Sequence, residues 1–178
     1  ADKGVTNAMY NYALMVDKGE DIEVNKKEAA KYYKLAADQG DVDSMINYGI
    51  MSSEGEGIEK NKRKAAHNYK LAADQGEPKA MLYYAIMLSI GDGIEKNKKE
   101  AAKYFKLSSD QGNIEAMTRY ADMLSKGDVI GLDKIEASKL YQYAADHGNV
   151  DSMYKYALML DEGDGISENK EEASKYYK

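Results

Sequence analysis

The sequence repeats itself every 36 residues over its whole length, and this period limits the possible folds more than any other feature. A tetrad of the type Ala-Asp-Gln-Gly recurs at that spacing without an insertion, beginning at Ala1, Ala37, Ala73, Ser109 and Ala145. A fixed period of roughly 20–50 residues is typical of a solenoid, in which each unit packs only on its neighbours. The sequence therefore predicts a single domain over residues 1–178, with repeats 1–36, 37–72, 73–108, 109–144 and an incomplete 145–178. Because the motif is cut at both ends, we expect this domain to be part of a longer array.

Each repeat carries the start and stop signals of two helices. The first helix is expected to begin after the tetrad glycine, at the N-cap residues Asp41, Asn113 and Asn149 or with Pro78 in its first turn. It is expected to end at a left-handed glycine, which is Gly19, Gly55, Gly91, Gly127 or Gly163. The second helix is expected to begin at Asn25, Asn61, Asn97, Asp133 and Asn169, and a glutamate three residues later completes a capping box in four repeats (Glu28, Glu100, Glu136, Glu172). No segment alternates with period two, so we predict an all-α fold, an α/α superhelix (solenoid) of five 36-residue helix-turn-helix repeats.

The side-chain pattern predicts how these helices bury their faces. The predicted core stripes are Ala8, Tyr12 and Val16 with Met9 and Met15 on the first helix, Ala29, Tyr33 and Ala36 on the second, and their counterparts in later repeats. All 10 methionines occupy the two repeat positions of Met9 and Met15. A ladder of Met and aromatic residues could also suggest a soft-metal site. Methionine at helical spacing ordinarily fills a core, so the pattern favours packing.

The composition excludes several classes of function. The formal net charge is -6, from 25 Lys and Arg against 31 Asp and Glu, and phosphate binding needs a basic surface, so no nucleic-acid partner is expected. The absence of cysteine excludes disulfides, zinc–thiolate sites and thiol catalysis. No apolar run reaches the roughly 20 residues that span a membrane, so no membrane insertion is expected. We therefore expect a cytoplasmic protein, with the lumen of the endoplasmic reticulum as the open alternative.

The sequence contains no recognisable set of catalytic or ligand-binding residues. His67 and His147 lie in different repeats and different elements, whereas a general base needs a placed partner. The Gly-Asp-Gly segments 91–93 and 163–165 lack the third glycine and the preceding strand of a dinucleotide-binding loop. They also lack the alternating oxygen ligands of a calcium loop. The sequence therefore predicts a protein that is not an enzyme and that has no metal site and no cofactor.

The repeat pattern resembles the Sel-one-like (SLR) repeat, a relative of the tetratricopeptide repeat, over essentially the whole chain. The marks are the small residue of the first helix, the Gly-x-Gly loop and the Ala-x2-aromatic-aromatic segment of the second helix. The small residues are Ala8, Ser44, Ala80, Ala116 and Ser152, and the loops are 55–57, 91–93 and 163–165. The chain departs from the pattern where Asp21 and Val129 replace the second loop glycine. Because a branched residue tolerates positive φ poorly, we expect Gly131 to supply the turn beside Val129.

The resemblance implies an adaptor that scaffolds protein complexes. Members of the family are associated with ubiquitin-ligase assembly, cell-wall synthase regulation and bacterial host interaction. A secreted, cysteine-rich branch has been associated with penicillin binding and β-lactamase activity. This chain has no cysteine, so that activity is not carried over.

An apolar row on the first helices, opposite the Ala–Tyr face, is the candidate binding site. It contains Leu14, Ile50, Ile86 and Leu158, with Tyr10, Ile46, Leu82 and Tyr154 one turn earlier, and Asn47, Tyr83 and Arg119 as variable neighbours. Asp122, Thr118 and Arg119 interrupt the row in repeat four. One interpretation is that neighbouring first helices pack side by side and bury the row. The other is a concave groove, lined by these residues, that accepts an apolar peptide or helix. In the related tetratricopeptide arrays the first helices line the concave surface, which favours this interpretation by analogy.

These observations lead to one functional hypothesis and one alternative. The hypothesis is a protein–protein interaction scaffold that binds a protein or peptide partner on the concave face of the superhelix. The alternative is a structural solenoid that associates end to end through uncapped terminal repeats, so the chain is expected to be a monomer or to self-associate in that way. Lys26, Lys27, Lys31 and Lys34 alternate with glutamate on the second helix and are expected to form a solvated convex face.

Overall fold

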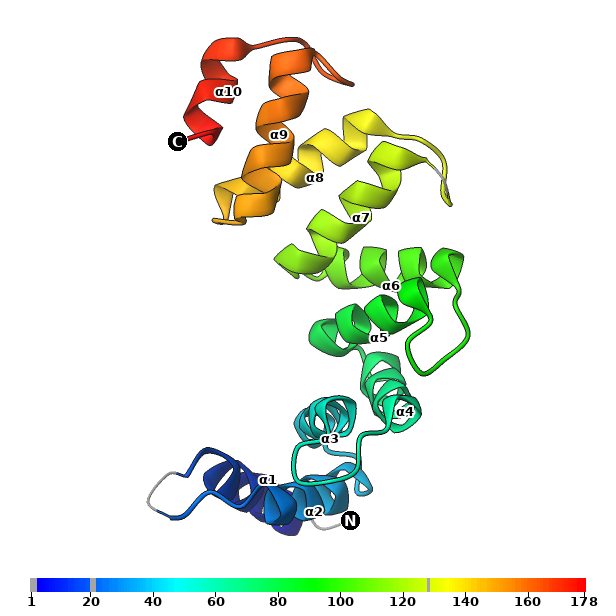
Figure 1. The fold of residues 1–178 in the computed structure, drawn as a ribbon, viewed down its shortest axis with the longest axis vertical. Helices are drawn as coiled ribbons and strands as arrows, with labels where there is room; N and C mark the ends of the chain where they lie inside the picture. Colours follow the sequence, from blue (N-terminus) through cyan, green and yellow to red (C-terminus); the bar gives the residue numbers. More distant parts are fainter. Residues whose placement is uncertain (1–2, 20–21, 128) are drawn as a thin grey trace. The chain divides into compact units, whose positions relative to one another are not determined.

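The computed structural model describes residues 3–19, 22–127 and 129–178, and within these ranges it consists of helices joined by loops (Figure 1). The first helices of the repeats are α1 (Lys3–Lys18), α3 (Val42–Glu54), α5 (Pro78–Ile90), α7 (Ile114–Lys126) and α9 (Val150–Glu162). The second helices are α2 (Lys26–Ala37), α4 (Lys62–Asp74), α6 (Lys98–Asp110), α8 (Lys134–Asp146) and α10 (Lys170–Tyr176). No strand occurs in the described ranges. The predicted all-α chain of five helix pairs is confirmed.

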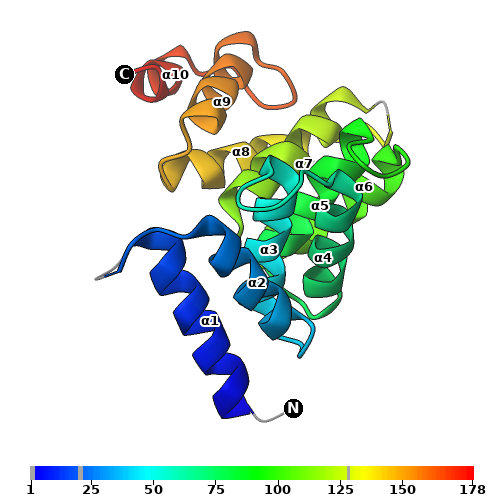
Figure 2. The same cartoon turned by 60° about the horizontal axis from the view of Figure 1, so that its bottom comes forward.

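The chain divides into two compact units, Ala1–Asn97 and Lys98–Lys178. The first unit holds α1 to α5 and the second holds α6 to α10. Within each unit every helix packs on the next one along the chain, as the α9–α10 hairpin in Figure 2 illustrates. The single domain over residues 1–178 and the longer array stay predictions.

The first helices begin and end at the residues that the local signals indicated. The side chains of Asp41, Asn113 and Asn149 accept hydrogen bonds from the backbone N–H three residues later. Pro78 is the first residue of α5, which is capped by Glu77, a residue that the sequence analysis did not name. The closing glycines take left-handed backbone conformations, with φ between 63° at Gly127 and 83° at Gly91. These N-cap and C-cap predictions are confirmed.

Four of the second helices begin at the predicted N-cap residues, which are Asn25, Asn61, Asp133 and Asn169. The second hydrogen bond of the expected capping box, from the N-cap backbone N–H, goes to a different acceptor. The side chain of Asn25 accepts from the N–H of Glu28 at 3.0 Å. In a capping box the N-cap backbone N–H would donate to the glutamate. Here the N–H of Asn25 donates to the carbonyl of Val16 at 2.8 Å instead. The same bond recurs from Asn61 to Ser52, Asn97 to Leu88, Asp133 to Leu124 and Asn169 to Leu160. This N–H therefore ties the second helix to the last turn of the first.

The Gly-x-Gly loops join neighbouring repeats as well as ending the first helix. Gly57 has a φ of 70°, and a Cβ there would lie 2.2 Å from the carbonyl oxygen of Lys26 on α2. The middle residue of each such loop also forms an ion pair with the preceding repeat. These pairs are Lys26–Glu56 at 3.3 Å, Lys62–Asp92 at 2.9 Å and Lys134–Asp164 at 2.5 Å. Interpreting the loops only as helix-terminating turns was therefore incomplete.

The loops of repeats one and four depart from this pattern. The expectation that Gly131 replaces the missing glycine is wrong, because Gly131 does not adopt a positive φ. Val129, at the position of Gly57, is partly buried. Asp21, the other departure, lies outside the described residues.

The predicted core stripes are mostly buried, although Tyr120, Met123 and Met153 are only partly buried. Ala29, Tyr33 and Ala36 on α2 are 0% exposed. On the first helices most members of the Met and Tyr stripes are buried, including Met51, Tyr84 and Met159. On α1 the stripe is only partly buried: Val16 is 2% exposed, whereas Tyr12 is 37% and Met15 40% exposed, and no described second helix precedes α1. Burial of these faces is thus a property of the contact between repeats.

Candidate interaction surface

Of the three first-helix positions in the predicted row, one lies mostly inside the array. Ile46 and Leu82 are only 3% exposed, and Thr118 at the same repeat position is 4% exposed. Tyr10 is partly buried beside the ring of Tyr33, with 6.1 Å between ring centroids. Tyr154 on α9, in contrast, is 58% exposed. For Ile46, Leu82 and Thr118 the structure favours the packing interpretation, so these residues are not available to a partner.

The other two positions reach the surface and define what we call the first-helix surface. Its members in the first unit are Asn11, Leu14, Asn47, Ile50, Tyr83 and Ile86, and in the second unit Arg119, Asp122, Lys155 and Leu158. None of these side chains is buried, although the helices that carry them are packed on their other sides. The two positions are three residues apart and so share one face of each helix.

In the first unit this surface is apolar and amide-rich, with one aromatic side chain. Ile50 and Ile86 are partly exposed at equivalent places on α3 and α5. Tyr83 packs on Tyr69 of α4, with 5.1 Å between ring centroids, and the ammonium of Lys79 lies 5.9 Å from the Tyr83 ring centroid. Burial raises the pKa of Tyr69 far above its ordinary value, so its hydroxyl stays protonated. Tyr83 is therefore held in place by its neighbours while one part of its ring remains accessible.

In the second unit the surface is built around an ion pair between neighbouring first helices. Lys155 on α9 donates to both carboxylate oxygens of Asp122 on α7, at 2.7 and 2.9 Å, and to Asp151 at 2.6 Å. Burial alone would lower the pKa of Lys155, but the hydrogen bonds to Asp122 and Asp151 outweigh it and raise the pKa. Lys155 therefore stays charged and couples repeat four to repeat five.

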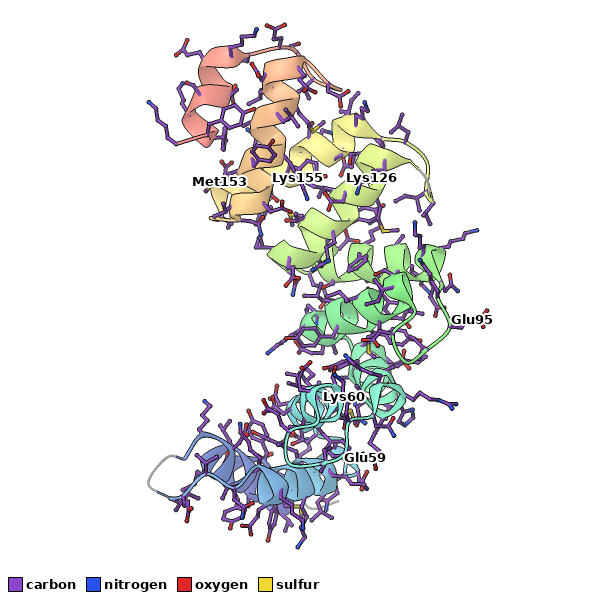
Figure 3. The ribbon with its side chains drawn as sticks, viewed as in Figure 1. Glu59, Lys60, Glu95, Lys126, Met153 and Lys155 are labelled. Atoms are coloured by element: carbon purple, nitrogen blue, oxygen red, sulfur yellow. The ribbon has the colours of Figure 1, made fainter. Side chains whose placement is uncertain are left out.

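A small pocket lies beside this ion pair. It has a volume of about 250 Å3, and its lining includes Lys126, Lys155 and Leu158. Figure 3 labels Lys126 on α7 and Lys155 on α9. The hydroxyl of Tyr141 on α8 also donates to Asp122. Burial, followed by this bond, raises the pKa of Tyr141 far above its ordinary value. The pocket thus combines an apolar side with fixed charges.

The polar residues that interrupt the row in repeat four form hydrogen bonds and ion pairs with other residues of the protein. Thr118 shares a hydrogen bond with Ser152 at 2.7 Å, Asp122 pairs with Lys155, and Arg119 pairs with Glu115 on its own helix at 2.8 Å. The sequence analysis grouped these residues by position and missed the pairing of Asp122 with Lys155. The pairing of Asp122 with Lys155 could have been predicted from their separation of one repeat minus three residues, because this spacing places opposite charges on adjacent first helices.

The side chains considered for metal binding or acid–base chemistry lie apart from one another in the described ranges. No group of three or more His, Cys, Asp or Glu side chains in these ranges could hold a metal ion. His67 is exposed on α4, while His147 stacks on Tyr143 with 4.1 Å between ring centroids. The two histidines belong to different units. Across the same residues, no helix is both long and apolar enough to cross a bilayer.

Several solved structures have a fold similar to that of this chain. A protective antigen present in uropathogenic Escherichia coli strains, which displays an SLR fold, superposes with a TM-score of 0.94 at 24% identity over 99% of this chain. A Sel1 repeat protein from Oxalobacter formigenes gives a TM-score of 0.91 at 27% identity over 97% of this chain. An immunity protein from Pseudomonas aeruginosa gives a TM-score of 0.60 at 21% identity over 97% of this chain. The chain spans 38%, 71% and 64% of the lengths of these three proteins. No curated protein sequence matches the chain.

The model of one protein family matches the chain in every repeat. The Sel1 repeat is found at residues 6–41, 42–77, 78–113, 114–149 and 150–178. Its period equals that of the tetrad, and only the residue chosen as the start of each copy differs. Together with the helix pairs and the similar SLR structures, these matches confirm the predicted solenoid fold. The chain therefore belongs to the Sel1 repeat family.

Proposed function

We propose that the chain is a non-enzymatic scaffold that binds a peptide or a partner protein on its first-helix surface. The observation that carries this proposal is the partial exposure of Leu14, Ile50 and Ile86 at one repeat position on three successive first helices. Solvated helix faces are usually polar, so an open row of aliphatic side chains indicates a binding surface. Sel1 repeats generally serve protein–protein interaction, which supports the same role.

The chemistry of the surface suits a polypeptide ligand. Aliphatic side chains such as Ile50 and Ile86 can receive apolar side chains of a partner. Asn11 and Asn47, at the neighbouring position, carry amides that both donate and accept, as the backbone of a bound peptide requires. Tyr83 adds an aromatic contact of the kind enriched at protein interfaces. In related tetratricopeptide arrays the first helices line the concave face, and we assign the surface to that face by this analogy.

The test is a charge reversal of the surface with a matched control. In one variant Ile50→Glu and Ile86→Glu place carboxylates on the surface. In the control Ile90→Glu and Val24→Glu introduce the same charge at apolar side chains that are 62% and 51% exposed and lie outside it. Both variants are compared with the parent chain by circular dichroism and by affinity capture from a cell lysate with quantitative mass spectrometry.

We expect both variants to stay helical and only the surface variant to lose its bound proteins. Loss of helicity in the surface variant alone would mean that Ile50 and Ile86 belong to the interior. Unchanged capture by a folded surface variant would place the binding site elsewhere on the chain.

A second candidate role is end-to-end self-association. Tyr154 and Tyr177 at the last repeat are 58% and 47% exposed, whereas Leu82 and Tyr33 at the same repeat positions are 3% and 0% exposed. At the other end, Tyr12 and Met15 are exposed on α1. The two end faces therefore match the two sides of the contact between repeats, so a head-to-tail contact between chains could bury both. A mass that rises with concentration in light scattering would support this role, and a constant monomer mass would contradict it.

A further inference from the structure

A pocket of about 710 Å3 opens in the first unit between α2 and the loop that follows α3. Ala30, Tyr48 and Ile58 give it apolar lining, and Lys27 and Lys31 on α2 stand at its edge. Tyr48 and Ala30 belong to the hydrophobic core of this unit, so the floor of the pocket is part of the rigid packing. This pocket lies on the second-helix face that the sequence analysis interpreted as solvated.

The rim of this pocket carries positive charge that the protein itself leaves unpaired. Lys34 is engaged with Asp38 at 2.5 Å. Lys27 and Lys31 form no ion pair with any residue in the described ranges, and the ammonium of Lys31 only approaches the Tyr32 ring, at 5.5 Å from its centroid.

Two carboxylates, those of Glu28 and Glu59, also line the pocket and offset part of its positive charge. Glu28 is already occupied, because it accepts from the Tyr12 hydroxyl at 3.1 Å and from the Asn25 amide at 3.3 Å. Glu59 stands on the loop that faces α2. A further cation, the ammonium of Lys64, lies 5.8 Å from the Tyr48 ring centroid. The lining is thus an apolar floor with more cationic than anionic groups around it.

An equivalent pocket lies one repeat further along the same unit. Its volume is about 510 Å3, and it is lined by Arg63, Ile94 and Glu95. Each of these residues follows its counterpart, Lys27, Ile58 or Glu59, by 36 residues, and Glu59 and Glu95 lie on equivalent loops (Figure 3). The guanidinium of Arg63 forms no ion pair within the described part of the chain. In the second unit the same repeat position holds Lys99, Ile135 and Glu171, so the cation is not present in every repeat.

We propose that these two pockets of the first unit bind an acidic segment of a partner protein. One apolar side chain of the segment enters each pocket, and its carboxylates pair with Lys27, Lys31 and Arg63. Charge complementarity favours this occupant, because the groups at the larger pocket that form no ion pair within the described residues, Lys27, Lys31 and Glu59, carry a net positive charge. Two pockets on one unit also allow a single segment to bind both, which raises the affinity above that of either pocket. This surface is separate from the first-helix surface of the proposed function.

The test uses a defined peptide. The probe is a fluorescein-labelled synthetic peptide with two Glu-Leu-Glu motifs joined by a Gly-Ser linker, and its affinity is measured by fluorescence anisotropy. The pocket variant is Lys27→Glu with Lys31→Glu. The control is Lys3→Glu with Lys178→Glu, which changes the net charge equally at exposed residues that do not line the pockets.

We expect the pocket variant to bind the probe about tenfold more weakly and the control to change affinity by less than about twofold. Probes with glutamine for glutamate, or serine for leucine, should each bind about tenfold more weakly. The folded Ile50→Glu, Ile86→Glu variant should bind the probe as the parent does, which separates this inference from the proposed function.

Three outcomes would overturn the inference. The first is an equal loss of affinity in the pocket variant and the control, which would indicate non-specific electrostatics. The second is equal binding of the glutamine probe. The third is binding to phosphatidylserine vesicles that depends on Lys27 and Lys31 while the probe does not bind, which would make the surface a membrane contact. Circular dichroism on each variant checks that it is folded.

Discussion

Ser152 on α9 and Thr118 on α7 share a buried hydrogen bond, with 2.7 Å between the two hydroxyl oxygens. The equivalent serine of repeat two, Ser44, is equally buried at 0% exposure, but its hydroxyl has no hydrogen-bond partner within the described residues. The residue that would face it from repeat one, Tyr10, offers no such contact. The same residue type at the same repeat position therefore has opposite energetic consequences in the two units.

We predict that Ser44→Ala stabilises the protein and that Ser152→Ala destabilises it. Removing an unpaired buried hydroxyl should raise the free energy of unfolding by about 0.5–1 kcal/mol. Removing the Ser152 hydroxyl should lower it by about 1 kcal/mol, since Thr118 keeps a second bond to the Ile114 carbonyl at 3.1 Å. Urea denaturation followed by circular dichroism measures both changes. Equal effects of the two substitutions would contradict the prediction.

The ion pair between Asp122 and Lys155 should couple repeats four and five. Both side chains are less than one third exposed, so removing either partner leaves a partly buried charge. In a double-mutant cycle of Asp122→Ala and Lys155→Ala we expect a coupling energy of about 1 kcal/mol. The exposed pair Lys34–Asp38, at 51% and 57%, is the control and should give less than about 0.5 kcal/mol. Similar coupling energies in both cycles would show that partial burial does not strengthen the ion pair between Asp122 and Lys155.

The loop glycines should differ in their tolerance of alanine according to what lies beside them. Gly40 and Gly57 both have positive φ, at 95° and 70°, so alanine costs about 1 kcal/mol of backbone strain at each. A Cβ at Gly40 meets open space, whereas at Gly57 it collides with the backbone of Lys26. We therefore expect Gly57→Ala to lower the free energy of unfolding by at least about 3 kcal/mol and Gly40→Ala by about 1. Comparable thermal-denaturation midpoints for the two variants would rule out the inter-repeat role of Gly57.

Buried tyrosines should make the protein sensitive to alkali. Burial raises the pKa of Tyr69 far above the ordinary 10.0 and, with the hydrogen bond to Asp146, raises the pKa of Tyr176 to about 12. The neutral phenol is the form that the fold holds, so stability is constant below the unfolded pKa and falls as the pH rises above about 10.

The Tyr69→Phe variant tests this pH dependence at one site. Its free energy of unfolding, relative to that of the parent chain, should rise by about 1.4 kcal/mol for each pH unit above 10 and stay constant between pH 7 and 9. Urea denaturation across this pH range makes the comparison, in which the other titrating groups cancel. A difference that does not change with pH would mean that the Tyr69 phenol ionises equally well in the folded chain.

Local signals in the sequence were sufficient for the helix boundaries, but not for the loops. Capping depends on residues within four positions of the helix end, so Asp41 and Gly55 could be assigned directly. The N–H of Asn25, in contrast, was expected to donate to the side chain of Glu28. In the folded helix pair the carbonyl of Val16 lies close enough to accept this hydrogen bond instead. The contact of Gly57 with Lys26 crosses between repeats, so no local rule could predict it.

The sequence predicted which residues of the candidate surface share a helix face, but not how deeply each of them is buried. Helical periodicity correctly grouped Ile46, Asn47 and Ile50 on one side of α3, yet it could not tell that Ile46 would be covered and Ile50 left partly open. That distinction depends on how the neighbouring helices pack on α3. The pairing of Asp122 with Lys155 and the basic-rimmed pockets beside Lys27 and Arg63 also arise only when successive repeats pack together.

The sequence by itself determined the period, the helix pairs, their caps and the family, because each of these is written in residues close together or repeated at a fixed spacing. The tertiary structure alone decided which equivalent residues are buried, paired or exposed. The physical reason is that burial and pairing depend on neighbouring repeats, whose differing side chains give each equivalent position its own surroundings.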